Sequence, residues 1–186
     1  SRLHLAGVRV PETFGCIDGV LLMELVTDDE GDVAPRLGEI VLTEEQALED
    51  HAIMMYYVML MLCAGIVHGD LSEFNVLVDD YGPVIIDLPQ AVDASANNSA
   101  RAMLLRDVNN MTRYYGEYAP QILSSRYGEE MWAFYEEGEL KPDTELTGLY
   151  AGDADSADVD SVMDEIKAVM QEERDRQERL QEAAEA

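Results

Sequence analysis

Positive charge is scarce in this chain of 186 residues. Asp and Glu number 39 against 12 Lys and Arg, and the formal net charge at pH 7 is -27. Because affinity for a nucleic-acid backbone comes largely from Lys and Arg, we expect no direct nucleic-acid binding by this chain. The acidic excess fits either an adaptation to high intracellular salt, where screening shortens the reach of repulsion, or an ordinary acidic protein with an acidic tail.

Cysteines and long apolar runs are also few. Cys16 and Cys63 do not make a disulfide framework, and neither lies in a metal-ligand pattern. No apolar stretch reaches transmembrane length, and no secretory signal opens the sequence. We therefore expect no membrane partner and a reducing, cytoplasmic location.

The most informative stretch is residues 68–75, which read HGDLSEFN and are followed by Asp87. The H-x-D-x-x-x-x-N spacing is typical of catalytic loops that transfer phosphoryl groups, which have a metal-binding Asp downstream. Two short apolar runs, residues 76–78 and 84–86, enclose turn residues and predict a β-hairpin between the two motifs. An antiparallel hairpin would make Asn75 and Asp87 neighbours.

These polar side chains suit a metal-dependent reaction. Asn75 and Asp87 offer oxygen ligands for a hard cation such as Mg2+, which takes its remaining ligands from phosphate oxygens and water. Asp70 would lie on the same rim and could accept or orient the proton of an attacking hydroxyl. Taken one at a time, such residues are usually turn or cap residues, but their joint spacing, strand context and residue types favour a functional site in which Asp70 is catalytic and Asn75 and Asp87 are metal ligands.

Residues 68–75, together with residues 82–93 that read GPVIIDLPQAVD, resemble the RIO atypical protein kinases, and within them the RIO-one subfamily. Ordinary protein kinases have Asp-Phe-Gly at the metal site, whereas residues 87–90 here read DLPQ. Aminoglycoside phosphotransferase-like enzymes share the HGD and the Asn but lack the DLPQAVD continuation. A small-molecule phosphotransferase is therefore the weaker enzyme alternative. The resemblance covers about residues 1–150.

The resemblance implies ATP and Mg2+ as cofactors and the activity of a serine/threonine protein kinase or ATPase. It also implies a link to maturation of the small ribosomal subunit. The expected partners are ATP and a protein substrate or the pre-ribosomal small subunit. RIO-type enzymes resemble one another in forming an aspartyl-phosphate at the residue that matches Asp87, so Asp87 would be a nucleophile as well as a ligand.

Two parts that a protein kinase needs are missing before the catalytic motif. These are a Gly-rich loop over the phosphates and a strand lysine that pairs the phosphates of ATP. Lys141 and Lys167 both follow the motif, and the sequence opens with Ser1 close to an apolar run. We expect a fragment that is inactive as it stands. The competing hypothesis is a catalytically inactive fragment or pseudoenzyme that acts as a pre-ribosome binding module.

Three segments are expected. Residues 1–26 would be the remnant of a kinase N-lobe with the hinge, residues 27–150 the RIO kinase C-lobe, and residues 151–186 an acidic linker with a C-terminal helix. That helix would begin near Val159 and either dock on the lobe or a partner or extend into solvent. The fold class is α/β (α+β): a protein-kinase-like C-terminal lobe, mostly helical with a small catalytic β-hairpin, plus the last strands of an N-lobe.

The N-terminal remnant is predicted to be a β-hairpin. Residues 5–10 and 20–26 read as its two strands, with turn residues between them. By resemblance, residues 23–26 are the hinge between the lobes, where the backbone of Glu24 and Val26 would hydrogen-bond the adenine. A plain buried strand is the other interpretation of this segment.

Three helices are predicted in the C-lobe. A capping-box pattern at Thr43 predicts a helix that runs to about Ala64 and that Gly65 ends. Its Met-rich run is more often core than a partner groove. Amphipathic helices are also expected over residues 100–118 and 124–137. The aromatic anchors of the last helix would be Trp132, Phe134 and Tyr135.

Overall fold

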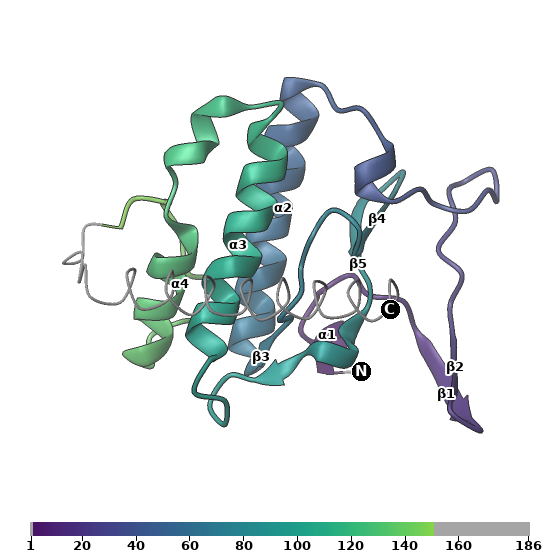
Figure 1. Cartoon of the computed structure of the whole chain (residues 1–186), viewed down its shortest axis with the longest axis horizontal. Coiled ribbons are helices and arrows are strands. Elements are labelled where there is room, and N and C mark those ends of the chain that lie inside the picture. Colours follow the sequence, from purple (N-terminus) through teal and green to yellow (C-terminus); the bar gives the residue numbers. More distant parts are fainter. Residues whose placement is uncertain (1, 151–186) are drawn as a thin grey trace, which may run out of the picture. The chain divides into compact units, whose positions relative to one another are not determined.

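The computed structural model describes residues 2–150, which fold as helices packed beside short antiparallel hairpins (Figure 1). This confirms the expected α+β class. Residues 151–186, where the acidic linker and the C-terminal helix are expected, lie outside the described residues. Between residues 2 and 150, no helix is both long and apolar enough to cross a membrane.

Helix α2, Glu44–Cys63, is the longest element within residues 2–150 and begins where its capping box predicts. The Thr43 hydroxyl accepts the N–H of Gln46 at 3.2 Å, and the Gln46 side chain accepts the N–H of Thr43 at 2.9 Å. Gly65 follows at a φ of +72°, a left-handed conformation that glycine adopts without strain. The Met-rich run lies in the core, as predicted. Its buried methionines are Met54, Met55, Met59 and Met61.

Helices α3, Ala100–Gly116, and α4, Tyr127–Glu136, pack against α2 and against each other (Figure 1). A 3-10 turn, η3 (Pro120–Ser124), separates them and starts at a proline, which lacks a backbone N–H. Because η3 extends to Ser124, helix α4 begins at Tyr127, three residues after the predicted start at Ser124. Two of its three predicted aromatic anchors are confirmed, because Trp132 is buried, Tyr135 packs against the core and their rings lie 5.3 Å apart, whereas Phe134 is only half-buried.

The predicted catalytic hairpin is present as strands β4, Val76–Asp79, and β5, Gly82–Ile85. The pairing continues one residue beyond the strands, where the N–H of Ile86 donates to the carbonyl of Asn75 at 3.0 Å. Asp87 follows directly. The hairpin therefore brings Asn75 and Asp87 to its open end, as the sequence predicts.

Short elements frame this hairpin. Strand β3, Ile66–Val67, leads from α2 into residues 68–75 and pairs with β6, Val92–Asp93. Two 3-10 turns, η1 (Leu37–Glu39) and η2 (Leu88–Gln90), lie in the connections before α2 and after β5. The pairing of β3 with β6 thus holds both ends of residues 68–91, the segment that contains the catalytic loop, the β4–β5 hairpin and Asp87.

The N-terminal hairpin lies later in the sequence than predicted. Its strands are β1, Thr13–Ile17, and β2, Val20–Met23, whereas α1, Arg2–Leu5, forms a helical turn. The strand predicted over residues 5–10 is therefore wrong, and the second strand, predicted over residues 20–26, ends at Met23, where the predicted hinge begins. Asp18 and Gly19 explain the position, because their φ angles of 51° and 81° make the tight turn that joins two strands.

Residues 8–10 are held by packing and by one backbone hydrogen bond rather than by strand pairing within the N-terminal hairpin. Val8 and Val10 are 2% and 6% exposed because they pack into the helical core, and the intervening Arg9 accepts the N–H of Ile85 at 2.9 Å through its carbonyl. On the other edge, the N–H of Val78 donates to the carbonyl of Pro35 at 2.9 Å. The catalytic hairpin is thus hydrogen-bonded to the segments before and after the N-terminal hairpin.

Candidate active site

His68 joins the catalytic loop to the strand that leads to Asp87. The imidazole is 2% exposed, and its Nε2 lies 2.9 Å from the carbonyl oxygen of Ile86. Its Nδ1 accepts the N–H of Asp70 at 3.3 Å. A ring that accepts at Nδ1 donates at Nε2, so one neutral tautomer satisfies both contacts. The first residue of the motif therefore has a structural role, and it places Asp70 relative to the hairpin.

Gly69 is the position in the loop where only glycine fits. Its φ is +83°, and a Cβ there would lie 3.1 Å from the carbonyl oxygen of Gln90 and 3.6 Å from Met103. The left-handed backbone and the close approach to η2 both exclude a side chain. This explains the glycine between His68 and Asp70.

Asp70 and Asn75 are brought together, as the spacing predicts. The Nδ2 of Asn75 donates to the carbonyl of Asp70 at 2.8 Å and lies 3.5 Å from its Oδ2. Within residues 2–150, the Oδ1 of Asn75 accepts no hydrogen bond, whereas its amide nitrogen is held by Asp70. That oxygen is the atom a hard cation would need.

Asp87 occupies a strained backbone position at the open end of the hairpin. Its φ and ψ are 62° and 56°, a left-handed conformation that costs a non-glycine residue about 1–2 kcal/mol. The residue is exposed, and its carboxylate accepts no hydrogen bond from residues 2–150. Strain held at an open carboxylate is common at functional positions. Its role as a metal ligand stays a prediction.

A buried carboxylate on α3 accepts hydrogen bonds from the backbone of the catalytic loop. Asp107 is 1% exposed, and its two oxygens accept the N–H of Gly69 at 2.7 Å and the N–H of Leu71 at 3.0 Å. Burial raises the pKa of Asp107, although the two N–H donors and the nearby Arg106 favour its ionised form. Asp107 thus takes up backbone donors that would otherwise be buried without partners.

Two neighbours of Asp107 bind the carbonyls of the same loop residues. Arg106 donates to the carbonyl of Gly69, and the Nδ2 of Asn110 donates to the carbonyl of Leu71 at 3.2 Å. Both peptide groups that flank Asp70 are therefore held by one helix. Such support fixes the backbone position of Asp70.

The motif spacing gives no role to Asp107. A signal is nevertheless present, since Asp107 occupies a core-facing position among Leu104, Val108 and Met111 on an amphipathic helix. A charge at such a position is costly unless it is paired or hydrogen-bonded. The loop that satisfies it lies 36 to 38 residues earlier in the chain.

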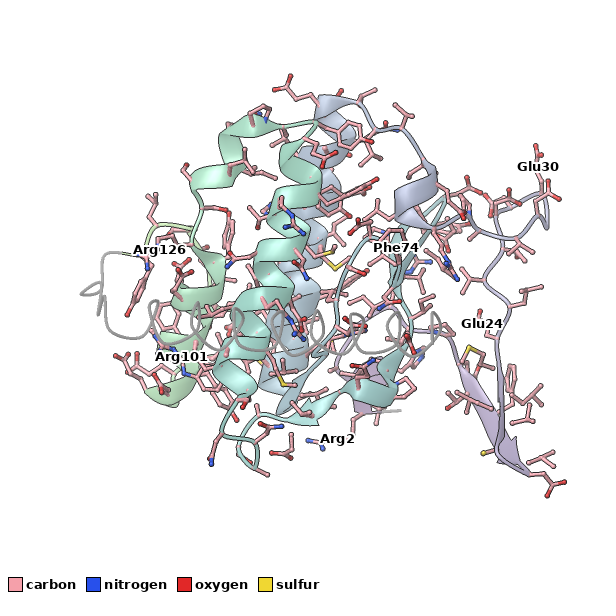
Figure 2. All side chains as sticks on the ribbon, in the orientation of Figure 1. Arg2, Glu24, Glu30, Phe74, Arg101 and Arg126 are labelled. Atoms are coloured by element: carbon pink, nitrogen blue, oxygen red, sulfur yellow. The ribbon has the colours of Figure 1, made fainter. Side chains whose placement is uncertain are left out.

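The predicted hinge borders a cavity. Residues 24–27 line a space of about 360 Å³ together with residues 7–10, Asp79 and Val84. This volume is within the range of small-molecule sites. Asp70, Asn75 and Asp87 are not among the lining residues. Figure 2 shows Glu24 where the N-terminal hairpin joins the rest of the fold, with Phe74 marking the catalytic loop.

Hydrogen bonding around the hinge leaves two backbone groups open. The N–H of Glu24 donates to the carbonyl of Glu12 at 2.8 Å, and the carbonyl of Val26 accepts the N–H of Ala34 at 3.0 Å. The Glu24 carbonyl and the Val26 N–H have no partner within residues 2–150. These are an acceptor and a donor two residues apart, as adenine recognition by a hinge requires.

The fold and the loop define a protein-kinase-like C-terminal lobe, in which a catalytic loop rests on a central helix beside a short hairpin. The family model described as the RIO domain matches residues 1–127. The chain belongs to the RIO family.

Individual proteins similar to this chain agree with the family assignment. The chain is 39% identical over 117 residues to the RIO-type serine/threonine-protein kinase Rio1 of Haloferax volcanii, which covers 62% of the chain and 38% of the relative. It is 32% identical over 136 residues to the serine/threonine-protein kinase RIO1 of Chaetomium thermophilum, covering 68% of the chain and 26% of the relative. The human RIO1 kinase is 31% identical over 126 residues, covering 67% and 22%. The chain thus spans 38% or less of the length of these relatives.

Proposed function

We propose that this chain is the catalytic-loop part of a RIO-type serine/threonine protein kinase or ATPase, which transfers the γ-phosphoryl group of ATP with the help of Mg2+. The observation that supports the proposal is that the side chain of Asn75 bonds to Asp70, while its carbonyl accepts the N–H of Ile86, the residue before Asp87. The names of the relatives, all serine/threonine-protein kinases, support the same activity.

Each carboxylate has a separate task in this proposal. The open Oδ1 of Asn75 and the carboxylate of Asp87 fit a hard cation that also binds phosphate oxygens and neutralises their charge. Asp70, fixed between the two peptide groups held by α3, orients the attacking hydroxyl and accepts its proton. In the RIO family Asp87 is also the position that would carry a transient phosphoryl group. Its carboxylate oxygen would attack the γ-phosphorus as the bond to ADP breaks, and water would then release phosphate.

The cavity beside the hinge is the proposed place for the adenine. The Glu24 carbonyl can accept from the exocyclic amine, and the Val26 N–H can donate to a ring nitrogen. Val84 lines the cavity, and Asp87 follows it by three residues, about 10 Å at the rise of an extended chain. An extended nucleoside triphosphate can bridge that separation from base to terminal phosphate.

The physiological partner we propose is a protein substrate or the pre-ribosomal small subunit, met in the cytoplasm. With a net charge of -27, the chain would contact such a particle through protein surfaces rather than through RNA phosphates.

A binding module without turnover is the second candidate. All residues of β1 and β2 are exposed, including Phe14, Ile17 and Leu22, so this hairpin has no covered face within residues 2–150. A two-stranded hairpin alone is marginal in water. For this reason we expect the 186-residue chain to bind ATP weakly and to show no kinase activity by itself.

The proposal is tested by titrating ATP into the chain with and without Mg2+ while following thermal unfolding. We expect a small upward shift that needs Mg2+ and that Asp87→Asn removes. Asp18→Asn is the matched control, since Asp18 is also an exposed aspartate with a positive φ but lies in the distant β1–β2 turn. Equal shifts in both variants would contradict the site, and micromolar affinity would contradict the weak binding expected for this chain.

A further inference from the structure

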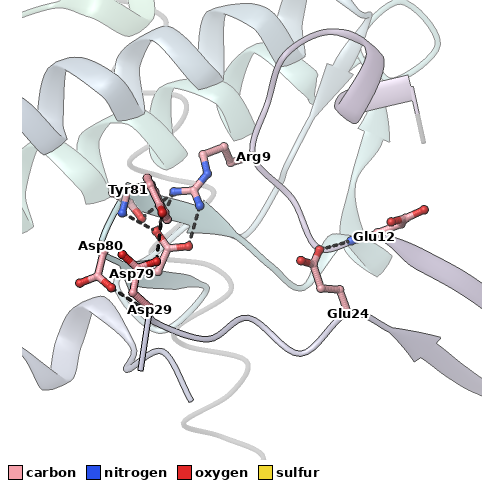
Figure 3. A network of polar contacts seen from close by, with 8 residues as sticks. Arg9, Glu12, Glu24, Asp29, Asp79, Asp80 and Tyr81 are labelled. Atoms are coloured by element: carbon pink, nitrogen blue, oxygen red, sulfur yellow. Dashed lines mark hydrogen bonds and ion pairs between the residues drawn. The ribbon is translucent and has the colours of Figure 1, made fainter. Parts of the chain in front are cut away.

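Arg9 and Asp79 form a bidentate ion pair at the closed end of the catalytic hairpin (Figure 3). Nη1 of Arg9 donates to Oδ1 of Asp79 at 2.9 Å, and Nη2 donates to Oδ2 at 2.6 Å. Nη1 also donates to the carbonyl of Gly82 at 3.1 Å. The side chain of Asp79 is only 7% exposed. Paired N–H donors on one carboxylate fix orientation as well as distance.

The pair stays charged in spite of its burial. Desolvation acts to raise the pKa of Asp79, but hydrogen bonds from Arg9 and from the N–H of Tyr81, with the attraction of Arg9, outweigh it and lower that pKa. The hydrogen bond to Asp79 in turn raises the pKa of Arg9. Removing one partner would leave the other as an uncompensated, partly buried charge.

Arg9 binds both strands of the hairpin. Its side chain bonds to the end of β4, and its carbonyl accepts the N–H of Ile85 on β5 at 2.9 Å. Arg9 and Asp79 also line the cavity that residues 24–27 border. The ion pair thus attaches one wall of the cavity to the hairpin whose other end carries Asn75 and Asp87.

The segment after the hinge is attached to the same turn. Oδ2 of Asp80 accepts the N–H of Asp29 at 2.8 Å, and the hydroxyl of Tyr81 donates to Oδ1 of Asp29 at 3.0 Å. The guanidinium of Arg9 lies 5.9 Å from the centre of the Tyr81 ring. Asp29 follows Val26 by three residues, so the C-terminal end of the hinge segment is attached to the turn of the catalytic hairpin, whereas Glu24 at its other end bonds to Glu12 (Figure 3).

We propose that Arg9 and Asp79 are positioning residues for the nucleotide. Their ion pair holds the hinge at a fixed place on the hairpin. A nucleotide whose base is bound at the hinge then presents its phosphates to Asn75 and Asp87. This inference rests on the proposed function. Neither side chain touches the reacting phosphate in this scheme. Their effect is on nucleotide affinity, because a hinge that moves relative to the hairpin must be reordered when the nucleotide binds.

The test compares three variants of the full 186-residue chain. Asp79→Asn keeps the shape of the side chain and removes its charge. Arg9→Lys keeps the charge and removes the paired donors. Glu129→Gln is the matched control, because it breaks the 3.0 Å ion pair between Arg126 and Glu129 on α4, away from the cavity. A far-UV spectrum and a melting curve establish that each variant is folded.

Two readouts are measured: amide hydrogen exchange and the dissociation constant for Mg-ATP by NMR titration. In Asp79→Asn we expect exchange at Ile85 and at Ala34, which donates to the hinge carbonyl of Val26, to rise at least tenfold. Exchange at Ala64, at the end of α2, should stay unchanged. The dissociation constant should rise about tenfold in Asp79→Asn, less in Arg9→Lys and not at all in Glu129→Gln.

The two readouts separate the possible failures. Faster exchange at Ile85 alone, with unchanged exchange at Ala34 and unchanged affinity, would show a local structural ion pair and overturn the inference. If the wild-type chain binds no nucleotide, the proposed function fails. The exchange at Ala34 then still decides whether the pair holds the hinge.

Discussion

The carboxylate of Asp107 on α3 accepts the backbone N–H of Gly69 in the catalytic loop at 2.7 Å, although the two residues are separated by 38 positions. A second bond to Leu71 makes the support two-sided. The loop therefore rests on a helix that is itself packed in the core. The placement of Asp70 is a property of that helix as much as of its own motif.

Asp107→Asn tests this support. An amide has one acceptor oxygen, so one of the two loop N–H groups would face an NH2 group and lose its partner. We expect the free energy of unfolding to fall by about 1–3 kcal/mol in denaturant titrations. Asp143→Asn, an exposed aspartate, is the control and should change little. A variant at residue 107 as stable as the wild type would show that the loop does not depend on this carboxylate.

His51 predicts how stability depends on pH. The ring is 3% exposed, its Nε2 lies 3.0 Å from the Thr112 hydroxyl, and burial lowers its pKa to about 4 from the usual 6.5. Between these values the unfolded chain holds a proton that the folded chain does not. The contribution of the neutral His51 ring to the free energy of unfolding is complete above pH 6.5. It is lost as the pH falls to about 4, a change of about 3 kcal/mol.

Unfolding measured at several pH values across that window checks the His51 prediction. Because carboxylates also titrate near its lower end, the decisive quantity is the difference between the wild type and His51→Gln. The variant should lose that part of the pH dependence, whereas His4→Gln, at an exposed position, should keep it. Identical pH profiles for all three proteins would be inconsistent with a neutral buried ring.

The success of the sequence-based predictions depended on how local the determining contacts are. The cap of α2 needs only Thr43 and Gln46, and the β4–β5 hairpin needs only neighbouring apolar runs and a turn. Both were predictable. Residues 5–10 resemble a strand in their apolar spacing, but Val8 and Val10 fill the helical core instead of pairing in the N-terminal hairpin. The apolar spacing is the same in both cases, and only tertiary packing decides between a hairpin strand and a core segment.

Salt should stabilise this chain. A net charge of -27 opposes compaction by self-repulsion, and the Debye length shrinks to about 3 Å at 1 M salt. We expect the melting temperature to rise between low and molar KCl. A flat or falling melting temperature would remove the argument that the acidic composition is a salt adaptation.

Substitutions of Asp70 and Asp87, the two carboxylates of the proposed site, should have different effects in a longer protein that includes a Gly-rich loop and a strand lysine. Asp87→Asn should abolish metal-dependent turnover by weakening the cation site. Asp70→Asn should leave Mg-ATP binding nearly intact and slow phosphoryl transfer by about a hundredfold or more, since it acts on the proton in the transition state. Steady-state kinetics with a separate nucleotide-binding assay resolve the two effects. Equal loss of nucleotide binding in both variants would make this assignment of roles wrong.

The most direct test of the proposed site is paramagnetic broadening of NMR signals by Mn2+ in the presence of ATP. The account predicts that low concentrations of Mn-ATP broaden the side-chain amide of Asn75 and the backbone amides beside Asp87 first. Asp87→Asn should abolish this pattern, and excess Mg2+ should reverse it. Broadening that is centred instead on the acidic loop of residues 28–32, and that Asp87→Asn leaves unchanged, would contradict the site.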